Sequence, residues 1–234
     1  TGKALGLDGD RLVHPIDGDD RPAVCSACSS TKFRRVKLGV TGVSEELEHI
    51  ARRPVTEVDA STELLPDGAD LYVGTEAIFH RLDNAELVAF LDFDQEILAP
   101  RYRAAEEAMS LIVHAARLVG ARENGGRILI QTRMPQHPVL QAAINADPGS
   151  VARTELEMRK QLRQPPESHW AVISGSSAAE FVERLGQRDG LEVMNANNTR
   201  WRVRSNDREL LLETLSSVER PTGRLRIEIN PLRA

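Results

Sequence analysis

The stretch Leu87-Val88-Ala89-Phe90-Leu91 is an uninterrupted apolar run that ends in Asp92-Phe93-Asp94. A long passage with helical composition follows from Arg101 to Ala121, and a second apolar run, Arg127-Ile128-Leu129-Ile130, comes after it. Apolar runs of this length between polar turns predict strands that are buried on both faces of a parallel sheet. Strand, crossover helix and strand then form the expected unit of an α/β fold.

Length and charge limit the possible classes of protein. The chain has 234 residues, which predicts one large or two small domains, and 41% of them are apolar. The formal net charge of -5 means that any nucleic-acid site must be a local basic patch. No apolar run reaches the roughly 18 residues of a membrane-spanning helix. The start Thr1-Gly2-Lys3 has no secretory pattern and no initiator Met, so we expect a piece of a longer cytoplasmic protein.

The first third of the chain predicts little regular structure before its first helix. Residues 1 to about 24 are rich in Gly and Asp, which is typical of a loop or a weak hairpin. A helix is expected from Ser44, as its N-cap, to the stop at Pro54. Strands are expected at Val55–Val58 and Leu71–Thr75, and the second ends in small residues, where open α/β sheets bind ligands.

The last third predicts a separate small domain. Helices are expected at His137–Asn145 and Pro148–Leu162, and Pro165-Pro166 then interrupts the chain, so the domain boundary is expected there. The elements that follow are expected in the order βαββαβ, the ferredoxin-like split unit. Ser177 and Glu180 form a capping box for its first helix, and Asn206 or Asp207 can cap the second.

Arginines alternate with apolar residues in two of these strands. Because side chains in a strand point to alternate faces, the arginines share one face and Trp201 belongs to the core on the other. A basic open sheet could bind the phosphates of single-stranded DNA; the alternative is a solvated strand face without a ligand. The candidate DNA-binding residues are Arg200, Arg202, Arg204, Arg224 and Arg226.

Cys25-Ser26-Ala27-Cys28 has the spacing of a metal knuckle. A structural zinc ion needs four ligands, and this chain supplies two thiolates, with His14 as a possible third ligand. The favoured interpretation is therefore an incomplete half-site.

Sequence signs of catalysis are missing or weak. The chain has no G-x-x-x-x-G-K-[ST] loop for nucleotide phosphates and no Asp-Glu pair that could hold magnesium in that setting. Asp92 and Asp94 share a strand face at a carboxyl end, but no base, metal partner or nucleophile follows them. A structural role is expected for both, and no catalytic residue is assigned.

An ordered set of motifs resembles the PriA family of primosomal replication-restart helicases. The set comprises Gly74-Thr75-Glu76, Leu91-Asp92-Phe93-Asp94, Tyr102-Arg103-Ala104-Ala105-Glu106, Gly126 to Thr132, Pro135-Gln136-His137-Pro138 and Arg226 to Pro231. The resemblance covers nearly the whole chain. It implies a RecA-like second helicase lobe followed by a small C-terminal domain, with boundaries at 1–38, 39–165 and 166–234.

The resemblance also implies where a nucleotide cleft would lie. Gly74 and Thr75 match the start of helicase motif V, although the family's Lys-Gly-His is replaced by His80-Arg81-Leu82. The motif VI run corresponds to His114 through Ala121, which includes Arg117 and Gly120, but Leu118 and Ala121 stand at the two positions of the arginine fingers. Arg117 and Arg122 are the arginines nearest to those positions.

These matches lead to a functional hypothesis with two alternatives, one of which is a pure interaction domain that binds other proteins. We expect a DNA- and protein-binding component of replication restart that has lost helicase catalysis. The other alternative, the rival helicase interpretation, is half of an active ATP-dependent 3′-to-5′ helicase whose first lobe lies outside this chain, so that ATP and magnesium would bind only with that lobe. The resemblance alone implies zinc, single-strand DNA-binding protein and primosome components as partners, and association with the nucleoid.

Overall fold

The computed structural model describes residues 6–8, 11–13, 20–25, 28–31, 40–121, 123, 125–197 and 199–231. His14 and Arg122, both considered above, lie outside this part of the chain. The fold divides into two compact units, Thr1–Arg81 and Leu82–Ala234, which are described separately.

The first unit contains two small sheets. Strands β1 (Gly6–Asp8), β2 (Arg11–Val13) and β3 (Asp20–Pro22) pair antiparallel in chain order, so the loop or hairpin expected there is a three-stranded meander. Strands β4 (Thr56–Val58) and β5 (Tyr72–Gly74) pair in parallel, and the 3₁₀ helix η1 (Glu76–His80) follows directly.

Helix α1 (Val40–Ala51) begins earlier than the sequence indicated. Ser44 is a buried residue inside this helix, so its prediction as N-cap is wrong. The predicted end is nearly correct, because Arg52 adopts a left-handed conformation (φ 53°) and Pro54 follows it.

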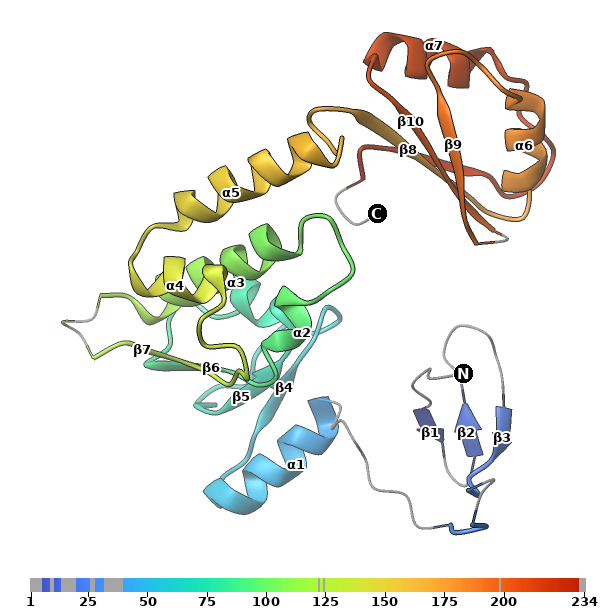
Figure 1. Cartoon of the computed structure of the whole chain (residues 1–234). Coiled ribbons are helices and arrows are strands. Elements are labelled where there is room, and N and C mark those ends of the chain that lie inside the picture. The colour runs from blue at the N-terminus through green and yellow to red at the C-terminus, as the bar shows by residue number, and fades with distance from the viewer. Residues whose placement is uncertain are drawn as a thin grey trace. The chain divides into compact units, whose positions relative to one another are not determined.

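The second unit begins with the predicted strand, helix and strand. Strands β6 (Leu87–Phe90) and β7 (Arg127–Ile130) pair in parallel, with Leu87 opposite Arg127 and Phe90 opposite Ile130. Helices α2 (Asp94–Ile97) and α3 (Ala104–Val119) connect them. Helices α4 (Pro138–Ile144) and α5 (Pro148–Gln161) follow, and α5 leads into the last sheet (Figure 1). Asp147 caps α5, and Pro148 occupies its first turn as expected.

One face of the β6–β7 pair carries the core of this region. Phe90 and Ile130 pack against a buried cluster that includes Phe93, Met109 and Ile112. The opposite face is open: Leu87 is 50% exposed and Leu129 is 56% exposed. Burial on both faces is therefore not found, because the helices that contact the pair all pack on a single side of it.

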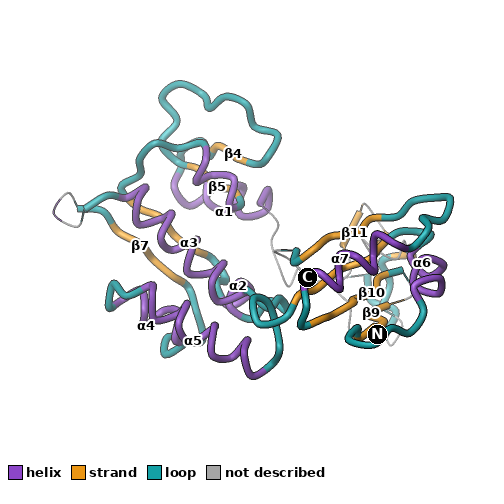
Figure 2. Tube along the Cα trace, turned by 90° about the horizontal axis from the view of Figure 1, so that it is seen from above, coloured by secondary structure: helices purple, strands orange, loops and turns teal. Residues whose placement is uncertain are grey.

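The chain ends in a four-stranded antiparallel sheet with two helices. Its strands are β8 (His169–Ser174), β9 (Glu192–Asn197), β10 (Arg200–Ser205) and β11 (Arg226–Ile229), in the spatial order β11-β8-β10-β9. Helices α6 (Ala178–Leu185) and α7 (Arg208–Ser217) connect β8 to β9 and β10 to β11 (Figure 2). The predicted βαββαβ order is confirmed.

The second buried cluster lies between this sheet and its helices. It joins Ala171 and Val203 of the strands to Phe181, Leu185 and Leu211 of the helices. The protein is thus a mixed α/β fold with parallel and antiparallel sheets. Within the described residues, no helix combines the length and the apolar character that crossing a bilayer requires.

Candidate nucleic-acid interface

The arginines of β10 lie on the face of the sheet away from α6 and α7. Trp201 and Val203 pack into the cluster with those helices, as the alternation predicted. Arg200, Arg202 and Arg204 alternate with them and so belong to the opposite face. We call this face of the sheet the arginine face. Its outer end lies at Arg200, and its inner end lies at Arg202 and Arg204.

The outer end is a row across three strands. Ser174 of β8 is opposite Arg200 of β10 on one side and opposite Arg226 of β11 on the other. Residues in such a register lie about 5 Å from their neighbours, so one arginine stands on each side of Ser174. Arg226 is 68% exposed on its side chain, and Arg224, which precedes β11, is also exposed. We call Arg200, Ser174 and Arg226 the outer row.

Among the described residues, carboxylates pair with two of the five arginines. Arg204 makes a close ion pair with Glu192 of β9, and Arg163 also reaches Glu192, at 3.0 Å. The hydrogen bond from Arg204 is the main cause that lowers the pKa of Glu192. Arg226 contacts Glu228 at 2.8 Å. Sequence reasoning missed Glu192, because it lies on a neighbouring strand and register cannot be seen in the sequence.

Arg202 has a different partner, an aromatic ring. Its guanidinium carbon lies 4.3 Å from the ring centre of Trp170, which is 3% exposed. Burial lowers the pKa of Arg202, and the charges of Arg200 and Arg204 lower it further. Arg202 is therefore less available to an outside phosphate than the outer row.

The inner end continues into the helices. The rings of Trp170 and Tyr102 lie 5.2 Å apart, and the guanidinium carbon of Arg159 lies 5.2 Å from the Tyr102 ring. Arg159, which is 6% exposed, contacts Glu106 at 2.9 Å. Burial alone would raise the pKa of Glu106, but the hydrogen bonds and charges of Arg159 and Arg103 outweigh it and lower that pKa.

The motif V positions have a structural role in the first unit. Gly74 is opposite Val58 in the β4–β5 register, and a Cβ at Gly74 would lie 2.2 Å from the Val58 carbonyl oxygen. Thr75 stands at the N-cap of η1 without a side-chain capping bond. This close approach of two backbones accounts for the glycine without a ligand.

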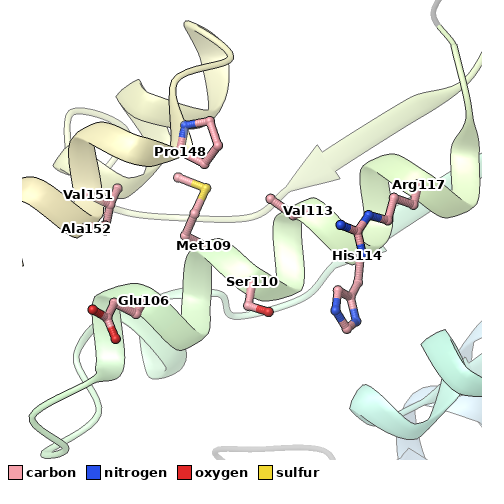
Figure 3. Close-up of a pocket in the computed structure, with 9 residues that line it drawn as sticks. All are labelled: Glu106, Met109, Ser110, Val113, His114, Arg117, Pro148, Val151 and Ala152. Atoms are coloured by element: carbon pink, nitrogen blue, oxygen red, sulfur yellow. The ribbon is translucent and has the colours of Figure 1, made fainter.

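The motif VI positions lie on α3 and just after it. Leu118 is buried at 8% exposure, whereas Arg117 is exposed and Gly120 ends the helix with φ 68°. Arg117, His114, Ser110 and Glu106 line one side of a surface hollow of about 270 Å³, with Pro148 and Val151 of α5 opposite (Figure 3). An arginine at position 118 would point into the core rather than into this hollow.

The cysteine pair does not complete a metal site in the part of the chain described here. Within those residues, no group of three or more His, Cys, Asp or Glu side chains gathers around Cys25 and Cys28. Two thiolates do not fit a four-ligand zinc site.

Asp94 links the carboxyl ends of β6 and β7. Its carboxylate accepts hydrogen bonds from the Thr132 hydroxyl and from the Arg133 backbone N–H, the latter at 3.0 Å. The bond from Thr132 is the main cause that lowers the pKa of Asp94. These contacts are structural.

Comparison with known proteins confirms the resemblance found in the sequence over about two thirds of the chain, rather than nearly all of it. The chain is similar to the replication restart protein PriA of Synechocystis sp., with 29% identity over 161 residues, or 62% of this chain. It is 33% identical over 160 residues (66% of this chain) to the probable replication restart protein PriA of Mycobacterium leprae, and 32% identical over 168 residues (65%) to PriA of Thermotoga maritima. These alignments cover 19%, 24% and 23% of the relatives, so the chain spans about a quarter of their length or less. No protein-family model matches the chain.

Proposed function

We propose that this chain, which is similar to PriA over about two thirds of its length, is a DNA-contacting part of a replication restart protein. That similarity carries the restart role, since the relatives are named replication restart proteins. The outer row Arg200, Ser174 and Arg226 is the observation that carries the DNA contact. Such a role belongs in the cytoplasm at the nucleoid, with primosome components and single-strand DNA-binding protein as the partners.

Two domain assignments accompany this proposal. The strand order β11-β8-β10-β9, with neighbours antiparallel, supports a ferredoxin-like domain at 166–234. The parallel pairs β4–β5 and β6–β7 support a RecA-like lobe at 39–165. Residues 1–38 would be the remnant of a zinc-binding region, with Cys25 and Cys28 as its only thiolates.

We propose no catalytic step for this chain. It has no phosphate-binding loop, and a leucine occupies the first finger position in a buried site. The rival helicase interpretation depends on Arg122 or on Arg117, which is exposed beside the hollow on α3. It would need a first lobe with its own phosphate loop to bind ATP and magnesium.

The salt dependence of DNA binding tests the proposal. Each lysine or arginine that neutralises a phosphate of a single strand contributes about 0.7 to the slope of log affinity against log salt. We expect the chain to bind a labelled oligothymidylate, and Arg200→Ala or Arg226→Ala to reduce the slope by about 0.7 each. Fluorescence anisotropy at salt concentrations from about 50 to about 200 mM measures this slope.

Arg184→Ala is the matched control. Arg184 is an exposed arginine of the same domain, but it lies on α6, which covers the opposite face of the sheet, and it pairs with Glu180 at 2.7 Å. Its removal should leave the slope unchanged. Equal slopes for the unmodified chain and the three variants would mean that the outer row is a solvated strand face without a ligand. Failure of the unmodified chain to bind the oligonucleotide would overturn the DNA contact altogether.

A further inference from the structure

The inner end of the arginine face is also where the last sheet contacts the helices. Four side chains form a column, which we call the stack: Arg159 from α5, Tyr102 from the turn before α3, Trp170 from β8 and Arg202 from β10. The spacings along it are 5.2, 5.2 and 4.3 Å. Contacts between cations and ring faces at these distances are attractive, most of all when water is excluded.

Polar contacts hold two members of the stack, Tyr102 and Arg159, in place. The Tyr102 hydroxyl donates to the carbonyl of Pro231 at 3.0 Å, beyond the last strand. Arg159 is held by Glu106, and also approaches Glu155 at 3.8 Å. The stack is therefore a joint between the helices and the sheet.

Arg202 is the arginine of β10 that belongs to the stack. Its Nε atom is buried without a hydrogen-bond partner, so the Trp170 ring is its principal contact. It lies between two arginines on the same strand face, each about 7 Å away along the strand. Glu192 offsets the charge of Arg204, whereas Arg200 has no ion-pair partner among the described residues.

An anion beside Arg200 would offset the remaining repulsion, which is that between Arg200 and Arg202. A phosphate bound at the outer row places negative charge next to Arg200, two residues from Arg202. The guanidinium of Arg202 could then stay against Trp170 at lower electrostatic cost. The negative charge of the bound phosphate would thus favour the stacked arrangement, in which the last sheet contacts the helices.

We propose that Arg202 and the stack couple the binding of a phosphodiester at the outer row to the docking of the last sheet on the helices. This inference rests on the proposed function and deepens it, because it gives the DNA site a consequence elsewhere in the molecule. Coupling of this kind is reciprocal: if bound phosphate strengthens the joint, an intact joint strengthens phosphate binding by the same factor.

Reciprocity supplies the test, with the full chain and an oligothymidylate as the probe. Tyr102→Leu removes one of the two rings of the stack without changing any charge, and Tyr102 is not part of the outer row. We expect this variant to bind the oligonucleotide at least about fivefold more weakly, the lower end of typical couplings. Tyr72→Leu is the control, because Tyr72 lies in the first unit, where its hydroxyl contacts Ala69.

A second measurement follows the contact between the last sheet and the helices directly, through Trp170. The protein has two tryptophans, and Trp201 lies on the other face of the sheet, so Trp201→Phe leaves Trp170 as the sole indole. We expect the oligonucleotide to change Trp170 emission with the same midpoint as the anisotropy change. Circular dichroism of each variant establishes that it is folded.

The outcomes separate the two proposals. Normal oligonucleotide affinity in Tyr102→Leu together with unchanged Trp170 emission would overturn the coupling and leave the DNA contact standing. No binding by the unmodified chain would overturn both. Weaker binding in Tyr102→Leu but not in Tyr72→Leu, with a saturable emission change, would support the coupling.

Discussion

Arg159 lies between two carboxylates, Glu106 at 2.9 Å and Glu155 at 3.8 Å, and their pKa values are shifted in opposite directions. Both side chains lose hydration. Glu106 is compensated by hydrogen bonds from Arg159 and Arg103, so its pKa is lowered. For Glu155, burial raises the pKa, the charge of Arg159 only partly offsets it, and the charge of Glu106 adds to the rise.

The opposite shifts predict opposite effects of pH on stability. A raised pKa in the folded state contributes stability below the unfolded value, about 4.3 for Glu, and loses it as pH rises through the folded value. Glu155→Gln should therefore increase the free energy of unfolding relative to the parent, by an amount that grows from about pH 4 towards neutrality. Urea unfolding at a series of pH values, followed by tryptophan emission, measures this difference.

Glu106→Gln is the paired control for that series. Its lowered pKa contributes stability above the unfolded value, and this contribution disappears as pH falls through the folded value. The variant should be less stable than the parent at neutral pH, with a deficit that shrinks in acid. Parallel curves for the two variants would contradict the assignment of the shifts.

At the scale of elements, Gly74 is constrained by the neighbouring strand. A methyl group there would meet the Val58 carbonyl oxygen at 2.2 Å, and neither backbone of the β4–β5 pair can move without breaking their register. Gly74→Ala should lower the stability of the first unit by about 1–3 kcal/mol, as overpacking does. Thermal unfolding followed by circular dichroism measures it.

Gly149→Ala provides the contrast. The nearest atom to its new methyl group would be the guanidinium of Arg153 at 3.0 Å, the far end of a flexible side chain. In a helix this change should stabilise by about 0.5–1 kcal/mol. If Gly74→Ala were equally harmless, the close backbone approach would not explain this glycine.

Local pattern predicted the elements better than it predicted their ends. The period of two in β10 gave both the strand and its two faces, and Asp207 caps α7 as expected, by accepting from the backbone N–H groups of Glu209 and Leu210. The capping box of α6 is not formed, because the Ser177 hydroxyl donates to the Thr222 carbonyl at 2.8 Å. That contact joins residues far apart in the chain, which no local signal reveals.

The candidate site shows the same limit. The sequence placed Arg200, Arg202 and Arg204 on one face, but it gave them equal roles. The structure distinguishes them through Glu192, Trp170 and Ser174, which come from other strands. Charge and periodicity identify a basic face, whereas strand register decides which cations are already paired.

On the scale of the whole molecule, the two units differ in their cores. Both large buried clusters lie in Leu82–Ala234. In the described part of Thr1–Arg81, the buried apolar residues are Leu12 and Val58. The first unit should therefore unfold at a lower denaturant concentration than the second.

Two spectroscopic probes can separate these transitions. Trp170 and Trp201 are the only tryptophans, and both belong to the second unit, so their emission reports that unit alone. Circular dichroism reports both units, and we expect its transition to begin earlier than the emission change. Coincident curves would show that the chain unfolds as one cooperative body.

The open face of the β6–β7 pair affects how readily molecules of this chain associate with one another in solution. Leu87 of β6, Leu91 just after β6 and Leu129 of β7 form an apolar surface. The two strands pair with no third strand in the described part of the chain. Exposed apolar strands of this kind favour sheet-to-sheet adhesion between molecules. A net charge of -5 opposes such adhesion only at low ionic strength. The isolated chain should thus lose colloidal stability as salt is added, and a charged residue in place of Leu129 should raise the concentration at which it precipitates.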